Sequence, residues 1–311
     1  MDIILDEARK RDMKVWILDD SHFPSRYVNG ALKNKPNTLR RQSIYTKKIP
    51  VHAGKKVSVD IRKICKKLPT SMMWEIVKRQ MNKGADIFDD DTVLDVSVHV
   101  KGEDKPISIP YHLQGNKLSV QIPANADMLY ITILTRNAGI HRDYMNMMDE
   151  ESCKVLIDTV YEAHYAHCKD DFDKTIQGFF SDEPELGNGI YFTNQVKVGN
   201  DFDIPWSRDL QQEMEATFGD DWKSYMPMLF DNHGDDKQVA YTRVKFMDSV
   251  TKLVKKCFSE QIGNWCQQHG VSYIGRVIED NNQHCRTGSS LGHYFRGLAG
   301  QHMAGIDDFD G

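Results

Sequence analysis

Two apolar runs in this chain each end abruptly in carboxylates. Residues 175–181 lead into Glu183, and residues 271–278 lead into Glu279. Runs of this length, apolar at almost every position, are typical of parallel strands that are buried on both faces. The pattern therefore predicts two buried strands, each with a glutamate just beyond its carboxyl end.

Further segments fit an alternation of strands and helices. Apolar runs predict strands over 13–18 and 128–134, and the spacing of apolar residues predicts helices between them. Predicted helices cover 1–12, 149–167, 207–218 and 236–268. Such alternation favours a (β/α)8 barrel. About five barrel strands can be assigned by this pattern, so we expect a barrel that is incomplete at both ends.

The segment 45–126 has a different pattern. Apolar residues alternate with polar ones, and Gly, Asn and Lys mark turns, as in antiparallel strands with one solvated face. A helical pattern near 70–83 interrupts them. We expect 1–44 and 127–311 to form the barrel domain and 45–126 to be an inserted β-rich module. Its role stays open between sugar binding, assembly and covering a barrel edge.

Composition limits the function classes. The 311 residues carry a net charge of −5, which gives no electrostatic basis for binding nucleic acid or an anionic membrane. No apolar stretch reaches membrane-spanning length, and the first residues are typical of an amphipathic helix and not of a secretory signal. The six cysteines show no CxxC spacing, which favours reduced thiols and a cytoplasmic location.

Glu183 and Glu279 are the candidate catalytic residues. Two carboxyl groups presented from two strands are what glycosidic bond cleavage requires, at about 5 Å for retention and about 6.5 to 9.5 Å for inversion. Pro184 restricts Glu183 to extended conformations, and Phe179 and Phe180 are candidates for an apolar wall that would raise its pKa. The alternative is a solvated acidic turn.

Polar residues around these acids are candidates for sugar binding. Hydroxyl-rich ligands need fixed donors and acceptors with aromatic faces nearby. For the residues after Glu279 the alternative is a polar surface loop. For Asp19 and Asp20 it is a helix cap, a turn or a role in holding loops, and for Trp206 it is core packing. The candidates are Asp19, Asp20, Asp182, Trp206, Asp280, Asn281, Asn282, His284, Arg286, His293, Tyr294 and Arg296.

The sequence gives little support for other catalytic classes. His164, His167 and Cys168 have a spacing that could place both histidines on one helix face, but packing is favoured over metal binding. Asp201 and Asp203, or the aspartates at 307, 308 and 310, could hold a structural calcium, although neither group fits a known loop. We therefore expect no cofactor. A nucleophile elbow and a phosphate-binding glycine loop are also absent from the sequence.

The chain resembles bacterial glycoside hydrolases of the α-L-rhamnosidase-like (β/α)8-barrel group. The segments that carry the resemblance are 7–16, 23–25, Asn29-Gly30, 178–185, Trp265-Cys266, His269-Gly270, 279–284, 292–296 and 301–307. They span nearly the whole chain outside the β-rich module. Each is weak alone, and their order and number carry the match.

The resemblance implies a retaining or inverting glycosidase that acts on an oligosaccharide or glycoside. Glu183 would be the general acid and Glu279 its partner, with the polar residues after Glu279 lining the sugar pocket. Members of this group usually carry a strand before the first helix and continue past residue 307. The resemblance also predicts a histidine in the strand before Glu279, where this chain has Arg276.

Two other functions remain open from the sequence. A carbohydrate-binding protein or inactive remnant of a glycosidase would bind saccharide without turnover, and Arg276 and the short barrel favour it. A metal-dependent barrel hydrolase would lose activity on chelation, and the missing histidine ligands count against it. Hydrolysis by a carboxylate pair is the leading interpretation.

Overall fold

A computed structural model describes residues 1–64, 89–137, 143–186, 197–277 and 287–305. The chain divides into two compact units, each built from separate segments. We name them the parallel unit (Met1–Arg40, Asp143–Tyr191 and Val250–Gly311) and the antiparallel unit (Arg41–Arg142 and Phe192–Ser249) after their sheets. The fold is mixed α/β, as expected.

The parallel unit contains a four-stranded sheet in which every paired strand is parallel, in the order β1-β9-β11-β12. The order in the sheet is the order along the chain, so each connection leads to the next strand in space. The described strands form no closed barrel. Their bounds are β1 Val15–Leu18, β9 Ile176–Ser181, β11 Ser272–Gly275 and β12 Met303–Ala304.

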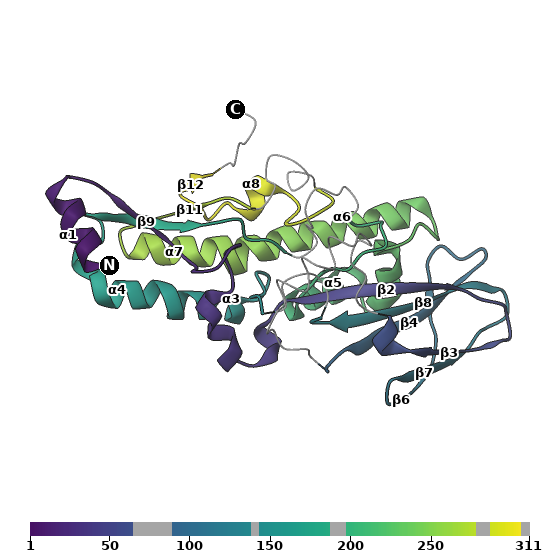
Figure 1. The fold of residues 1–311 in the computed structure, drawn as a ribbon. Coiled ribbons are helices and arrows are strands. Elements are labelled where there is room, and N and C mark those ends of the chain that lie inside the picture. The colour runs from purple at the N-terminus through teal and green to yellow at the C-terminus, as the bar shows by residue number, and fades with distance from the viewer. Residues whose placement is uncertain (65–88, 138–142, 187–196, 278–286, 306–311) are drawn as a thin grey trace, which may run out of the picture. The chain divides into compact units, whose positions relative to one another are not determined.

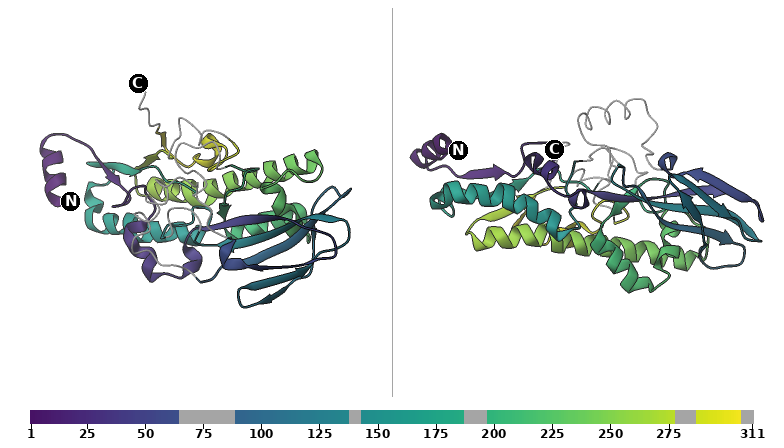
Figure 2. Two further views of the ribbon diagram at one scale, coloured as in Figure 1. Left: turned by 45° about the vertical axis from the view of Figure 1, so that its right-hand side comes forward. Right: turned by 90° about the horizontal axis from the view of Figure 1, so that it is seen from below.

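Helices cover one face of this sheet (Figure 1; Figure 2). Ile17, Phe179 and Tyr273 point to that face and are buried. Phe179 packs there against Tyr161 and Trp265, at ring-centroid distances of 4.1 and 5.9 Å. The helical elements of the unit are α1 Asp2–Lys10, η1 Val28–Asn34, η2 Asn37–Leu39, α3 Glu150–Leu156, η4 Ile157–Tyr161, α4 Glu162–Cys168, η5 Lys169–Asp171, η7 Val254–Glu260, α7 Gln261–Gln268 and α8 Tyr294–Gly297.

The opposite face of the sheet is apolar but largely open. One row crosses all four strands in register, formed by Leu18, Phe180, Ile274 and Met303. Leu18 is 50% exposed and Met303 56% exposed, whereas Ile17 on the helical face is 5% exposed. A parallel sheet is normally covered on both faces. This face is therefore an apolar surface that the described residues leave uncovered.

Gly178 occupies the centre of β9 for a steric reason. A Cβ atom added there would overlap the carbonyl oxygen of Ser272 on β11 and would press on the ring of Trp16 from β1. Glycine inside a strand often marks such a close approach. The position therefore lets Trp16 lie over the sheet.

The antiparallel unit contains a five-stranded sheet, ordered β10-β2-β8-β4-β5, and a three-stranded sheet, ordered β3-β7-β6. The bounds are β2 Gln42–Pro50, β3 Lys56–Asp60, β4 Thr92–Val100, β5 Ile107–Ser108, β6 His112–Gln114, β7 Lys117–Gln121, β8 Ala126–Thr135 and β10 Ile204–Trp206. The helical elements are η3 Ile61–Lys63, α5 Arg208–Phe218, η6 Trp222–Leu229 and α6 Asp236–Leu253, along which the chain passes into the parallel unit. Among the described helices, none is both long and apolar enough to cross a membrane.

The strand over 128–134 exists, but its expected place in the barrel is wrong. As β8 it pairs antiparallel with both β2 and β4, at the centre of the five-stranded sheet. Segment 192–249 also belongs to the antiparallel unit, so the expected domain boundaries shift. A fully apolar run looks the same in a parallel sheet and in an antiparallel strand buried on both faces. The predicted helix near 70–83 lies outside the described residues.

The two faces of the parallel sheet predict different responses to truncation. Ile17→Ala should lower the free energy of unfolding by about 2–5 kcal/mol, because it leaves a cavity under the helices. Leu18→Ala should cost less than about 1 kcal/mol, because this side chain is half exposed. Chemical denaturation of both variants would measure this. Equal costs would mean that the open face is covered in solution.

Candidate functional site

The candidate site lies in the parallel unit, where β1, β9 and β11 end. Because the strands are parallel, the residues that follow them emerge at the same edge of the sheet. Asp19 and Asp20 follow β1, Asp182 and Glu183 follow β9, and Arg276 follows β11. The structure thus brings together three strand ends that are far apart in the sequence.

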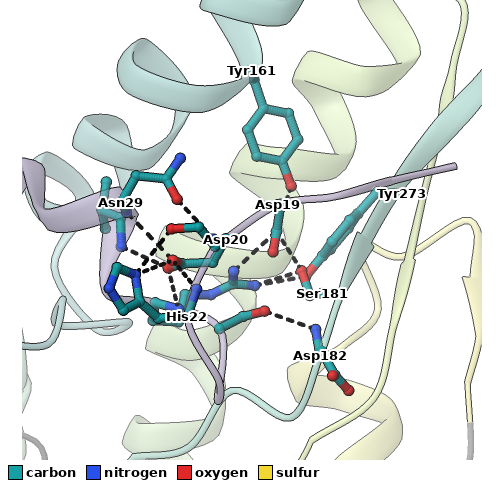
Figure 3. A network of polar contacts seen from close by, with 12 residues as sticks. Asp19, Asp20, His22, Asn29, Tyr161, Ser181, Asp182 and Tyr273 are labelled. Carbon is teal, nitrogen blue, oxygen red and sulfur yellow. Dashed lines mark hydrogen bonds and ion pairs between the residues drawn. The ribbon is translucent and has the colours of Figure 1, made fainter. Parts of the chain in front are cut away.

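A buried ion pair between Asp19 and Arg26 connects these strand ends. Both side chains are fully buried, and Arg26 Nη1 lies 3.0 Å from Asp19 Oδ2. The same oxygen accepts hydrogen bonds from Tyr161 (2.8 Å) and from Ser181 (2.7 Å). Arg26 Nη2 donates to the Ser181 hydroxyl at 2.6 Å, and Ser181 contacts the Tyr273 hydroxyl at 3.0 Å (Figure 3). One carboxylate therefore ties β1 to β9, to β11 and to the helical layer.

Two π-helical stretches bring aromatic rings to this pair. Tyr161 is the last residue of η4, and Phe258 lies within η7. The Arg26 guanidinium lies 4.3 Å from the centre of the Phe258 ring, a cation–π contact. π-helical turns are rare and occur often at functional sites. Here each turn places one ring against the buried pair.

The tyrosines around the pair stay protonated at neutral pH. Burial raises the pKa of Tyr273 to about 12 and the pKa of Tyr161 well above its usual value. Burial lowers the pKa of Arg26, but Asp19 and the neighbouring hydroxyls raise it above its ordinary value. The network therefore consists of one ion pair surrounded by neutral hydroxyl donors.

Asp20 organises the loop after β1. Its carboxylate accepts backbone N–H bonds from four residues between 22 and 29, including Arg26 at 2.8 Å and Val28 at 2.6 Å. Arg26, Val28 and Asn29 have positive φ angles, which is unfavourable for residues with a side chain. The carboxylate offsets this strain by satisfying the loop's donors (Figure 3). Holding the loop was one of the expected roles; sugar binding by buried Asp19 and Asp20 is not supported.

The loop that carries Glu183 is fixed on both sides. Ser25 bonds to Asp182 twice, donating its backbone N–H to the Asp182 carbonyl (2.8 Å) and accepting the Asp182 N–H at its hydroxyl (2.9 Å). Tyr144 donates its hydroxyl to the Ser25 carbonyl and accepts the N–H of Glu185. Glu183 itself has φ of 49°, so it is not extended as Pro184 had suggested. Strained backbone of this kind is often found at functional sites.

Glu183 has a cationic partner, Arg276. Arg276 Nη2 lies 3.1 Å from Asp182 Oδ1 and 3.7 Å from Glu183 Oε1. Phe179 packs into the helical layer and Phe180 lies on the open face, in the row with Leu18. The expectation that Phe179 walls the Glu183 carboxyl is therefore wrong.

The remaining candidates fall into three groups. Trp206 is a core residue of the antiparallel unit, stacked on Trp222 and Phe246, so its expected sugar stacking is not supported. His293 caps α8 and Tyr294 donates to the Gly305 carbonyl just after β12. Arg296 is exposed on α8. The catalytic candidate Glu279 and the binding candidates Asp280, Asn281, Asn282, His284 and Arg286 lie outside the described residues.

Within the described ranges, no three His, Cys, Asp or Glu side chains are placed to hold a metal ion. His164 bonds to the Val160 carbonyl and His167 pairs with Asp2, so the helical HxxHC spacing serves packing and surface contacts. Asp201 accepts a hydrogen bond from Tyr45 at 2.6 Å. The aspartates at 307, 308 and 310 lie outside the described residues.

Sequence reasoning missed most of the residues that build the site. Tyr144 and Tyr161 lie 41 to 142 positions from their partners in the site, and Arg26 lies 155 positions from Ser181, so no local pattern identifies these contacts. Ser181 is the one exception, because it stands directly before the predicted acidic strand end.

This chain shares little similarity with known proteins. No protein family and no curated protein matches the sequence. Among solved structures, similarity is found to the rhamnosidase from Novosphingobium sp. PP1Y, at 12% sequence identity and a TM-score of 0.36. The match covers 61% of this chain and 16% of the rhamnosidase. This chain thus corresponds to a small part of that enzyme's length, and similarity at this level carries no argument about activity.

The buried ion pair predicts a specific stability pattern. Arg26→Met should lower the free energy of unfolding by about 3–5 kcal/mol, because it leaves the Asp19 carboxylate buried without its cation. The double variant Asp19→Asn/Arg26→Met should cost less than the sum of the single changes. Arg9→Met, which breaks an exposed pair with Asp171, should cost at most about 1 kcal/mol. Urea titrations of the parent and of the Arg26→Met, Asp19→Asn, double and Arg9→Met variants would measure these losses. A loss below about 1 kcal/mol for Arg26→Met would refute the assignment of a buried ion pair.

Proposed function

We propose that this protein is a glycoside hydrolase that cleaves O-glycosyl bonds, with Glu183 and Glu279 as its carboxylate pair. The observation that carries the proposal is the parallel pairing of β9 and β11, in which Ser181 is in register with Gly275. Glu183 follows Ser181 by two positions and Glu279 follows Gly275 by four. The chain therefore leaves β9 and β11 at the same edge of the sheet, and barrel enzymes keep their catalytic groups at this edge.

The strand order supports a (β/α)8 barrel as the complete fold. Four parallel strands in sequential order, with helices on one face, match an arc of such a barrel. The row of Leu18, Phe180, Ile274 and Met303 would then be one layer of the barrel interior. We propose that further β/α units complete the barrel and cover this row.

The rigidity of the Glu183 loop also supports a catalytic role. A catalytic carboxylate must be held close to its productive position. Ser25 and Tyr144 fix the backbone before and after Glu183, and the ion pair of Asp19 with Arg26 fixes the loop that supplies Ser25. An acidic turn without a function would not need this support. The ordered sequence motifs point to the same enzyme class, with an oligosaccharide or glycoside as substrate.

The first test is nitrophenol release from a panel of aryl glycosides: rhamnosides, galactosides, glucosides and fucosides. We expect turnover of at least one sugar, reduced about 10²–10⁴-fold or more in Glu183→Gln and in Glu279→Gln. Asp171→Asn, a partly exposed acid paired with Arg9, is the matched control and should retain full activity.

The other outcomes separate the alternatives. A folded parent that is inactive on every sugar but binds saccharide would favour the carbohydrate-binding or remnant function. Activity that survives both glutamate changes would mean that other carboxylates act. Activity lost on chelation and regained with zinc would indicate a metal-dependent hydrolase.

A further inference from the structure

We propose that Arg276 holds Glu183 as an ionised carboxylate, so that Glu183 is the nucleophile or base of the reaction and not its proton donor. The assignment of a role rests on the proposed function, whereas the charge state does not. As a nucleophile, Glu183 forms a bond to the anomeric carbon; as a base, it takes a proton from a water molecule whose oxygen forms that bond. The glycosidic C–O bond breaks, and the leaving oxygen takes a proton from a second acid.

Arg276 lies close to both Asp182 and Glu183. One nitrogen of Arg276 lies 3.1 Å from Asp182 Oδ1 and 3.7 Å from Glu183 Oε1. An opposite charge within about 4–6 Å favours the charged form of a carboxyl group. The side chains of Glu183 and Arg276 are only 13% and 21% exposed, so water screens this interaction less than that of a surface pair.

Arg276 and Asp182 are both held in place by the fold. Alternation along the strands places Leu18, Phe180 and Ile274 on the open face, and Asp182 and Arg276 are the next positions on that face of β9 and β11. The Arg276 backbone N–H donates to the Ser181 carbonyl at 3.3 Å, while Ser25 fixes Asp182. Both sides of the contact are thus anchored, which distinguishes it from a pair of mobile surface side chains.

Other charged and titratable groups also lie around the described part of the loop. Asp182 and Glu185, on the same loop, are acids and would favour protonation of Glu183 by repulsion. The positive charge of Arg26 is paired with Asp19, and burial raises the pKa of Tyr144, so that this phenol is neutral. Arg276, whose Nη2 lies 3.7 Å from Glu183 Oε1, supplies a cation that opposes these acidic neighbours.

The charge state can be measured without any substrate. The parent, labelled with ¹³C at glutamate carboxyl groups, would be titrated by NMR, and the Glu183 signal assigned by its loss in Glu183→Gln. We expect Glu183 to titrate below its ordinary pKa of about 4.3 in the parent. In Arg276→Met the pKa should rise by about 1 to 3 pH units. Arg276→Lys should keep most of the lowering, and Arg9→Met should leave the Glu183 titration unchanged.

A Glu183 pKa above about 4.3 in the parent would overturn the proposal, and so would an unchanged value in Arg276→Met. The parent measurement decides even if the Arg276 variants fold poorly. If Glu183 titrates low but no glycoside is cleaved, the proposed function fails and the charge assignment stands. If glycosides are cleaved and Glu183 titrates high, only the charge assignment fails, and Glu183 is the proton donor.

Discussion

The ion pair between Asp19 and Arg26 is the interaction on which the parallel unit depends. Removing two charges from water is expensive, and their attraction offsets this only when the remaining polar atoms also find partners. Here Asp19 Oδ2 receives the guanidinium and two hydroxyls, and the ring of Phe258 lies against the cation. Asp19 Oδ1 and Arg26 Nε find no partner among the described residues. Such a pair is poor at adding net stability but effective at enforcing one arrangement.

That arrangement determines where the acids of the candidate site lie. Arg26 belongs to the loop that Asp20 organises, and Ser25 of the same loop fixes the backbone of Asp182. Asp19 therefore faces the helices and holds the structure, whereas Asp182 and Arg276 occupy the opposite, open face. The site is thus built in two layers: a buried polar layer that positions the strand ends, and a more exposed layer that carries the reactive groups.

The two sheets show how much a hydrophobic pattern can decide. Parallel pairing was predicted correctly for the strands that form β1, β9 and β11, because the helices between them force crossover connections. β8 has the same apolar character but joins the antiparallel sheet. Its neighbours β2 and β4 lie in the predicted β-rich segment or at its border. Apolar content reports burial on both faces and does not report strand direction.

The main elements, the mixed α/β class and the acids at strand ends could all be predicted from the sequence, because periodicity and strand length are local properties. The sequence did not determine which acid would be buried. Asp19, Asp182 and Glu183 look alike in the sequence, yet one holds a buried cation and two share a cation on the open face. Only the tertiary structure decided this, because Arg26, Tyr144, Tyr161 and Arg276 reach the strand ends through long-range packing. Whether an acid lies next to a cation depends on distances of a few ångströms between side chains, and no local sequence pattern encodes those distances.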